Sequence, residues 1–335
     1  MSDLPLFEQF PALKERIPRL EIGEFPTPVN PWERIGRRAG IPDLWVKRDD
    51  LTAPRFGGNK VRTLEFALAR GIESGRPLLV AAPHGSSWAA ACAYYGRSLG
   101  ADVDLVLFRR PSQSEREPND SIIRAYGREL RSCRTPIGIP LAFAGAWFRG
   151  RRLPPLILPI GGASARTALG YASAALELAE QVRSGEMPRP DLIVVPVGSG
   201  GTVAGLLAGV ALLGWNTLVI GVRVNHLLVA NRWSVQRMAR NSLRVILRAG
   251  KRRRGLPLPE FELEADYFGG EYGLPTEEGR EAARLVQEEE GVKLDLTYTG
   301  KAVAALLGRA REGRLPGPTV LYWHTFNSRD LTKLL

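Results

Sequence analysis

The chain has 335 residues, of which 44% are hydrophobic, and a formal net charge of +11 from 46 basic and 35 acidic side chains. This composition supports a large buried core in one or two domains and excludes a disordered chain or a coiled coil. No apolar run is long enough to cross a bilayer, and the N-terminus lacks a basic start followed by an apolar stretch. We therefore expect neither a transmembrane helix nor a signal peptide.

The cysteines and the basic excess bear on compartment and partners. Cys92 and Cys133 alone cannot build a disulfide framework or a metal cluster, so we expect no metal and a reducing, cytoplasmic compartment. The densest basic run, residues 248–254, is short and has no interleaved aromatic residues. It is typical of a solvated surface loop rather than a nucleic-acid-binding module. We expect no nucleic acid and no membrane among the partners.

Short apolar runs of strand length alternate with longer segments of helical periodicity. The predicted strands are residues 77–83, 103–108, 155–160, 191–197, 217–224 and 319–324. The predicted helices are residues 60–73, 87–99, 119–131, 165–184, 202–213, 276–290 and 300–312. This alternation predicts an α/β fold with a mainly parallel sheet. Residues 109–119 and 248–260 are expected to be irregular.

Residues 44–69, LWVKRDDLTAPRFGGNKVRTLEFALA, carry the most chemical information. Gly57 and Gly58 lack Cβ atoms just before Asn59 and Lys60, so the backbone can turn tightly there and let a flat group approach closely. Lys60 begins a predicted amphipathic helix, where the helix dipole and burial lower the pKa of an amine. An amine with a lowered pKa can attack an aldehyde. The same features also fit an ordinary surface lysine at the start of a helix.

A glycine-rich loop follows the predicted strand 191–197 and opens the predicted helix 202–213. Its residues are Gly198, Ser199, Gly200, Gly201 and Thr202. Backbone N–H groups at a helix N-terminus bind phosphate well. The loop has neither the Lys-Ser/Thr ending of a P-loop nor GxGxxG spacing. By itself it is equally consistent with a tight turn or with the phosphate site of another nucleotide.

The order of these residues resembles a known family. The run 47–52, then 57–60, Arg62 and 64–65, resembles the lysine segment of the D-cysteine desulfhydrase and 1-aminocyclopropane-1-carboxylate deaminase family of pyridoxal-phosphate (PLP) enzymes. That family belongs to the tryptophan-synthase-β-like group, fold type II. The resemblance also covers the glycine-rich loop and the runs EYGLP (271–275) and LDLTYTGKA (294–302).

The resemblance implies an α/β fold of two domains with parallel twisted sheets and PLP in the cleft between them. Residues 1–51 plus 161–335 would form the large PLP-binding domain and residues 52–160 the small domain. The family is usually dimeric, so a homodimer is expected.

The resemblance also implies roles for individual residues. Lys60 would be the Schiff-base lysine and the acid–base group at the substrate Cα. Tyr272 and Tyr298 would face the substrate. The alternative explanation for each is a buried tyrosine whose hydroxyl has a hydrogen-bond partner. The predicted catalytic residues are Lys60, Ser86, Tyr272 and Tyr298. The predicted cofactor-binding residues are Asn59, Lys60, Ser87, Gly198, Ser199, Gly200, Gly201, Thr202, Thr299 and Thr325.

Thr299 discriminates between the activities of the family. The cyclopropane deaminases have at this position a Glu that pairs with the pyridine nitrogen, whereas YTGK is the desulfhydrase-like version. Thr299 therefore argues against cyclopropane opening and suits elimination of a β leaving group.

Two stretches depart from the family pattern. Residues 85–90, GSSWAA, stand where the family has Gln-Ser-Asn-(His or Gln)-x-Arg. Ser87 thus replaces the Asn, Trp88 replaces the next polar residue, and the Arg is lost. Phe326 and Asn327 replace a Gly-Gly pair.

The sequence therefore predicts a PLP-dependent lyase or deaminase that performs α,β-elimination on a small amino acid similar to D-cysteine. The products would be pyruvate, ammonia and the leaving group. The alternatives are β-replacement, 1-aminocyclopropane-1-carboxylate deamination and racemisation. An alternative of another class is a non-catalytic binding protein on this fold. Lys60 and the glycine-rich loop together argue against it, because a repurposed pocket need not keep both.

Overall fold

The computed structural model describes residues 3–109, 118–147, 153–251 and 255–335. Its strands are β1 (Val29–Pro31), β2 (Asp43–Arg48), β3 (Leu78–Pro83), β4 (Val103–Phe108), β5 (Glu129–Cys133), β6 (Leu156–Leu158), β7 (Leu192–Val197), β8 (Leu218–Arg223), β9 (Phe261–Glu264) and β10 (Thr319–His324). Its α-helices are α1 (Pro5–Gln9), α2 (Pro11–Lys14), α3 (Glu33–Ala39), α4 (Lys60–Ser74), α5 (Ser87–Ser98), α6 (Pro118–Tyr126), α7 (Ile139–Trp147), α8 (Leu169–Arg183), α9 (Gly201–Leu213), α10 (Arg232–Ala249), α11 (Glu277–Glu290) and α12 (Thr299–Arg311). Short 3₁₀ turns include η1 (Asp49–Leu51), η3 (Ile160–Gly162) and η4 (Leu331–Leu334).

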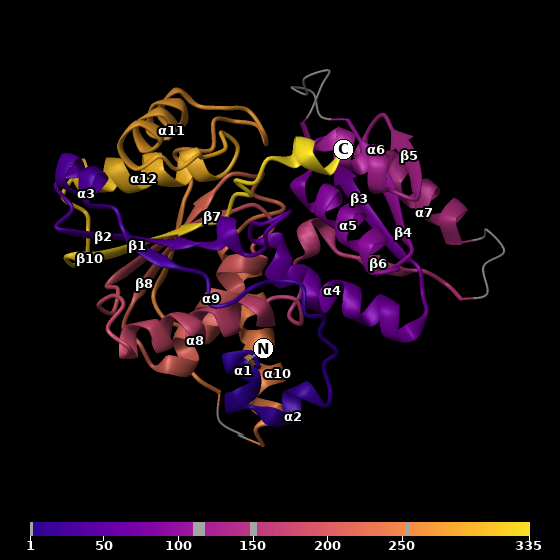
Figure 1. The fold of residues 1–335 in the computed structure, drawn as a ribbon, viewed down its shortest axis with the longest axis horizontal. Coiled ribbons are helices and arrows are strands. Elements are labelled where there is room, and N and C mark those ends of the chain that lie inside the picture. Colours follow the sequence, from indigo (N-terminus) through magenta and orange to yellow (C-terminus); the bar gives the residue numbers. More distant parts are fainter. Residues whose placement is uncertain (1–2, 110–117, 148–152, 252–254) are drawn as a thin grey trace.

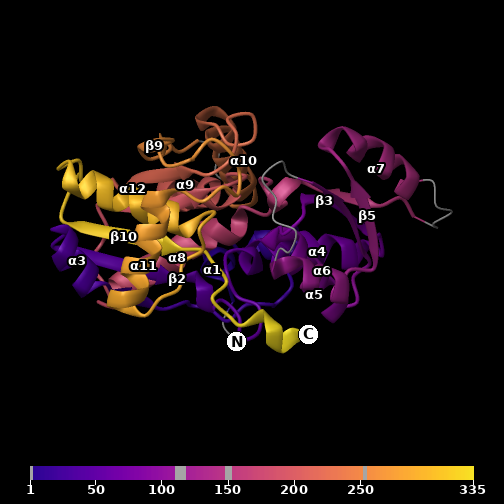
Figure 2. The same cartoon turned by 90° about the horizontal axis from the view of Figure 1, so that it is seen from above.

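These strands form two sheets that lie side by side (Figures 1 and 2). The six-stranded sheet has the order β1-β2-β10-β7-β8-β9, and only its edge strand β1 runs antiparallel to its neighbour. The four-stranded sheet has the order β5-β4-β3-β6 and is parallel throughout. The predicted α/β fold with mainly parallel sheets is confirmed.

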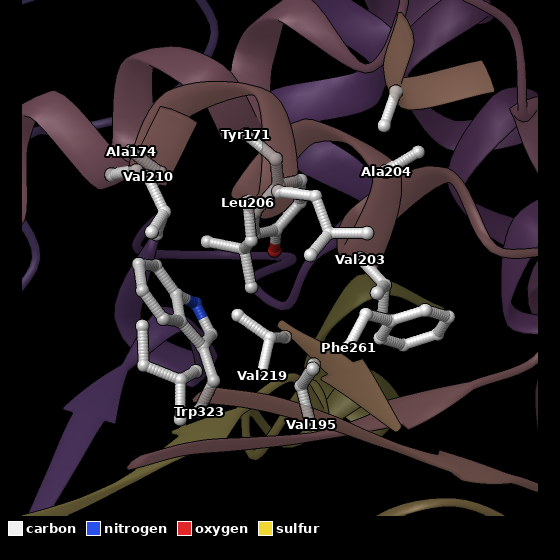
Figure 3. Close-up of a cluster of buried hydrophobic side chains, with 14 of the residues drawn as sticks. Tyr171, Ala174, Val195, Val203, Ala204, Leu206, Val210, Val219, Phe261 and Trp323 are labelled. Atoms are coloured by element: carbon white, nitrogen blue, oxygen red, sulfur yellow. The ribbon is translucent and has the colours of Figure 1, made fainter. Parts of the chain in front are cut away.

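The central strands are buried on both faces, which explains their continuous apolar sequences. Every residue of β7 (LIVVPV) and β10 (TVLYWH) is buried. Figure 3 shows Val195, Val219 and Trp323 of the large sheet facing side chains of α8 and α9. On the opposite face, α3, α11 and α12 enclose a second cluster. Helices on both faces are the arrangement that a buried parallel sheet requires.

The structure differs from the prediction in several stretches, and the strands β1, β2 and β9 and the helices α1, α2, α3 and α7 were not predicted. The predicted helix 119–131 is wrong in its last part, because α6 ends at Tyr126 and residues 129–133 form β5, paired with β4. Helix α10 was not predicted, although its buried residues follow helical spacing. Arg248 lies in the last turn of this helix, which ends at Ala249, instead of starting an irregular loop. Residues 252–254 of the basic run lie outside the described residues.

The two sheets correspond in sequence to the two predicted segments. All strands of the four-stranded sheet fall within residues 52–160, and those of the six-stranded sheet fall within 1–51 and 161–335. We propose these sheets as the cores of two domains with those boundaries. Among the described residues, no helix has the length and apolar character needed to span a membrane, and no group of side chains is suited to hold a metal ion.

A buried ionic network connects α4 to the large sheet. Lys47 Nζ lies 2.6 Å from Glu177 Oε1, and Arg62 contacts Glu177 at 2.8 Å and Asp49 at 2.9 Å. Burial alone would raise the pKa of Glu177, but Arg62 and Lys47 outweigh that effect and hold the pKa at about 2. Tyr171 OH donates to Asp49 Oδ2 at 2.6 Å. The network fixes α4, whose first residue is Lys60.

Candidate active site

Two adjoining pockets meet at Lys60. The first, of about 370 Å³, lies between the two sheets and is walled by the starts of α5 and α9. The second, of about 870 Å³, extends from the same place toward the C-terminal segment. The residues that line both pockets are Asn59, Lys60, Ser87, Tyr272, Tyr298 and Thr325.

Lys60 is the first residue of α4 and follows a tight glycine turn. Gly58 has φ +91°, and a Cβ there would lie 3.1 Å from the backbone nitrogen of Asn327, so the turn requires glycine. Lys60 is half-buried. Burial lowers the pKa of its amine to about 8, while nearby Cys92 acts in the opposite direction. The amine is therefore neutral in a far larger fraction of molecules at neutral pH than an exposed lysine amine is.

The glycine-rich loop forms another wall of the first pocket. Gly200 has φ +85°, and a Cβ on Gly198 would lie 2.8 Å from the Tyr298 ring. These glycines bring the backbone close to the space that the pocket encloses. Asn59 Nδ2 donates to Thr202 Oγ1 at 3.2 Å and so ties the lysine segment to the loop. The first N–H groups of α9 have no partners within the helix, which makes this wall suited to phosphate.

Ser86 and Ser87 form the start of α5 on the other side of the first pocket. Ser86 is the N-cap residue, and its Oγ accepts the backbone N–H of Ala89 at 3.4 Å. A hydroxyl that accepts such a bond still has its own proton to donate. The N-termini of two long helices therefore open on the first pocket, an arrangement that favours a ligand with two negative groups.

The two predicted tyrosines contact each other. Tyr272 OH and Tyr298 OH are 2.5 Å apart, and their rings meet edge to face. Asp295 holds Tyr298 in place, because its Oδ2 accepts the backbone N–H groups of Thr297 and Tyr298, both at 2.9 Å. The pair lies where the two pockets join, so a proton on either hydroxyl can reach a ligand there.

The two predicted threonines differ in position. Thr325 lines both pockets, and its carbonyl accepts the backbone N–H of Asn59 at 3.0 Å. Thr299 lines neither pocket. It is fully buried at the start of α12, where its hydroxyl donates to Asp295 Oδ1 at 2.6 Å. Every other residue of the predicted site lies on a pocket wall, and the role of Thr299 beside the cofactor ring stays a prediction.

Sequence reasoning missed several wall residues. Asn225 and His226, from the loop after β8, and Glu271 line the first pocket. Asn225 and His226 follow the carboxyl end of a predicted parallel strand, which is where such sheets place ligands, and that signal was available. Trp88 also lines the first pocket, so the aromatic departure in residues 85–90 changes the wall itself.

The walls fit PLP. An amine of lowered pKa, Lys60, lies opposite a helix N-terminus whose glycines would clash if they had side chains. The amine suits the aldehyde of PLP and the loop suits its phosphate. Asn59 connects the two walls through Thr202. The volume of the first pocket is in the range of small cofactor sites.

Comparisons with known proteins agree with this fit. The family model described as pyridoxal-phosphate dependent enzyme matches residues 20–325. A Pyrococcus furiosus protein, named provisionally as 1-aminocyclopropane-1-carboxylate deaminase, is 36% identical over 94% of this chain and 93% of its own length. The D-cysteine desulfhydrase of Serratia proteamaculans is 31% identical over 92% of this chain and 94% of its own.

Solved structures give the same result. A crystal structure of a homologue of 1-aminocyclopropane-1-carboxylate deaminase covers all of both chains with a TM-score of 0.83 and 30% identity. A PLP-dependent aspartate racemase, at 17% identity over 98% of this chain and 96% of its own, shares the fold with a TM-score of 0.64. The predicted cofactor and enzyme class are thereby confirmed, and the chain belongs to the family of pyridoxal-phosphate dependent enzymes.

Proposed function

We propose that this protein is a lyase that performs α,β-elimination on a small amino acid such as D-cysteine, giving pyruvate, ammonia and the leaving group. The observation that carries the proposal is the position of Lys60, where the two pockets meet and where burial lowers the pKa of its amine to about 8. Relatives named for D-cysteine desulfhydrase activity support it. We further propose a cytoplasmic location, on the basis of the two free cysteines, and a homodimer, as the family resemblance implies.

Different walls of the pockets would hold the cofactor and the substrate. The glycine-rich loop and Thr202 would hold the phosphate, while Asn59 and Thr325 fix the loop before Lys60. The start of α5, with Ser86 and Ser87, is placed to receive the substrate carboxylate. PLP, when bound, supplies an aldehyde for the amine and a ring that withdraws electrons from the substrate Cα.

Lys60 and the tyrosine pair, Tyr272 and Tyr298, transfer the protons of the reaction. The neutral Lys60 amine accepts the Cα proton, and the Cα electron pair then expels the β leaving group. Tyr272 or Tyr298 donates a proton to that group as the Cβ–S bond of D-cysteine breaks. Water completes the reaction, so that D-cysteine and one water give pyruvate, ammonia and hydrogen sulfide.

The test of this function is product analysis with purified enzyme and PLP. We expect pyruvate and sulfide to form from D-cysteine in equal amounts. L-Cysteine, D-serine and 1-aminocyclopropane-1-carboxylate serve as comparison substrates. Formation of only the opposite enantiomer would indicate a racemase, and consumption of an added thiol without pyruvate would indicate β-replacement. Failure to turn over any of these amino acids would overturn the proposal.

Deamination of 1-aminocyclopropane-1-carboxylate is the second candidate. The sequence argument against it was that Thr299 replaces the Glu that pairs with the ring nitrogen. In the structure Thr299 lines neither pocket, and its hydroxyl donates to Asp295, which lines the second pocket. The Pyrococcus furiosus relative also favours this candidate through its name. Release of 2-oxobutanoate from 1-aminocyclopropane-1-carboxylate, without pyruvate from D-cysteine, would select it.

The pH dependence of PLP capture tests the state of Lys60. Only the neutral amine attacks an aldehyde, and burial lowers its pKa from 10.5 to about 8. The rate of PLP binding to the apoprotein should therefore rise with pH and reach half its maximum near pH 8. Stopped-flow absorbance measures this rate at about ten pH values between about pH 6 and pH 11. A midpoint close to 10.5 would show that the amine is solvated as in an ordinary lysine.

A further inference from the structure

The segment after β10 closes over the loop that carries Lys60. Four hydrogen bonds join them. At the glycine turn, the Asn59 N–H donates to Thr325 O at 3.0 Å and the Gly57 N–H donates to Asn327 Oδ1 at 2.9 Å. Before the turn, Ser328 Oγ donates to Asp50 Oδ2 at 2.7 Å and Arg329 Nε donates to Ala53 O at 3.2 Å. The strand and the loop are distant in the sequence. The loop is therefore shaped by contacts from the end of the chain as well as by its own glycines.

Asn327 makes the contact closest to the glycine turn. Its Oδ1 accepts the N–H of Gly57 and, at 3.2 Å, the N–H of Arg329. The neighbouring N–H groups of the turn have backbone partners, since Gly58 donates to Asp49 O and Asn59 to Thr325 O, both at 3.0 Å. Gly57 is buried, so its N–H needs a partner within the protein. In this chain a side chain supplies that partner.

The segment is also attached at its far end. Tyr126 OH, on α6, donates to Leu334 O at 2.5 Å, and Leu331 and Leu334 pack against the core of the four-stranded sheet. Figures 1 and 2 show the C-terminus lying beside α5 and α6. Asn327 is therefore held between β10 of one sheet and the helices of the other, and its amide cannot drift from the turn without breaking these contacts.

We infer that Asn327 is a positioning residue for Lys60, acting through its hydrogen bond to Gly57 N–H, which fixes the glycine turn from which the lysine side chain enters the pockets. This inference rests on the proposed function of Lys60. It also gives a physical reason for the Asn at a position where the family resemblance predicts Gly. A glycine there has no side chain to accept the Gly57 N–H.

The experiment compares three variants with the parent protein. Asn327→Ala removes the acceptor, Asn327→Asp keeps an acceptor of the same shape, and Lys333→Ala is the control. Lys333 lies in the same segment, but it is exposed and lines neither pocket. Two quantities are measured: hydrogen exchange of the peptide spanning residues 51–60 in the apoprotein, and the dissociation constant of PLP by absorbance titration.

In Asn327→Ala the hydrogen of the Gly57 amide should exchange faster, and PLP should bind about tenfold more weakly, because one buried hydrogen bond is lost. Asn327→Asp should retain most of the protection, and Lys333→Ala should match the parent in both measurements. Unchanged exchange and PLP affinity in Asn327→Ala would overturn the inference, as would equal loss in the Ala and Asp variants. If the parent itself fails to bind PLP, the proposed function fails, and exchange at Gly57 alone then decides whether Asn327 holds the turn.

Discussion

Replacing Lys60 by alanine is expected to abolish turnover and covalent attachment of PLP while leaving the fold intact. Lys60 is half-buried and lines both pockets, and no contact of its amine contributes to the ionic network beneath α4. Loss of an essential amine that also transfers the Cα proton should lower kcat by about 10³-fold or more. Borohydride reduction followed by peptide mass analysis locates the attached cofactor in the parent and should find none in the variant.

Two other lysine changes make this test specific. Lys60→Arg keeps the positive charge, but a guanidinium stays protonated and cannot attack the aldehyde, so it should behave like the alanine variant. Burial also lowers the pKa of Lys301 to about 8, yet its Nζ donates to Phe268 O at 2.6 Å and lines neither pocket. Lys301→Met should keep the attached cofactor. Attachment of PLP to a residue other than Lys60 would contradict the assignment of the site.

Replacing Glu177 by alanine should give the largest loss of stability. Glu177 is 2% exposed and pairs with both Lys47 and Arg62, which are themselves buried. Removing the carboxylate leaves two buried cations without that partner, a change that costs about 3–5 kcal/mol. Urea denaturation followed by tryptophan fluorescence measures the free energy of unfolding.

The control for this change lies on the same helix. Glu180 has a side chain that is 42% exposed and lies 3.8 Å from Arg183, so Glu180→Ala should cost less than about 1 kcal/mol. The pH dependence has a defined sign. Because the folded protein holds the pKa of Glu177 at about 2, below its usual 4.5, this stabilisation is complete above pH 4.5 and is lost as the pH falls toward 2. Equal stability of the two variants would contradict the role of the network.

Local features of the sequence were enough to predict the parts of the site that depend on local structure. Glycines before Lys60 and in residues 198–202 indicate tight backbone turns, and the structure has φ of +91° at Gly58 and +85° at Gly200. Apolar runs flanked by amphipathic segments predicted the central strands, because a parallel strand covered on both faces must be apolar throughout. The family resemblance joined these features into a PLP site.

The tertiary structure decided what depends on distant partners. Thr299 matches a family position in sequence, but its hydroxyl is bound by Asp295 and lines neither pocket, which no alignment of motifs reveals. In the sequence Asn327 is only a departure from the family pattern. In the structure its Oδ1 lies 2.9 Å from Gly57 N and accepts a hydrogen bond from it. Lys47 and Glu177 are 130 positions apart, and their pairing follows from the way α8 packs beneath the sheet. Periodicity reports which face of an element is buried, whereas these contacts depend on which elements meet.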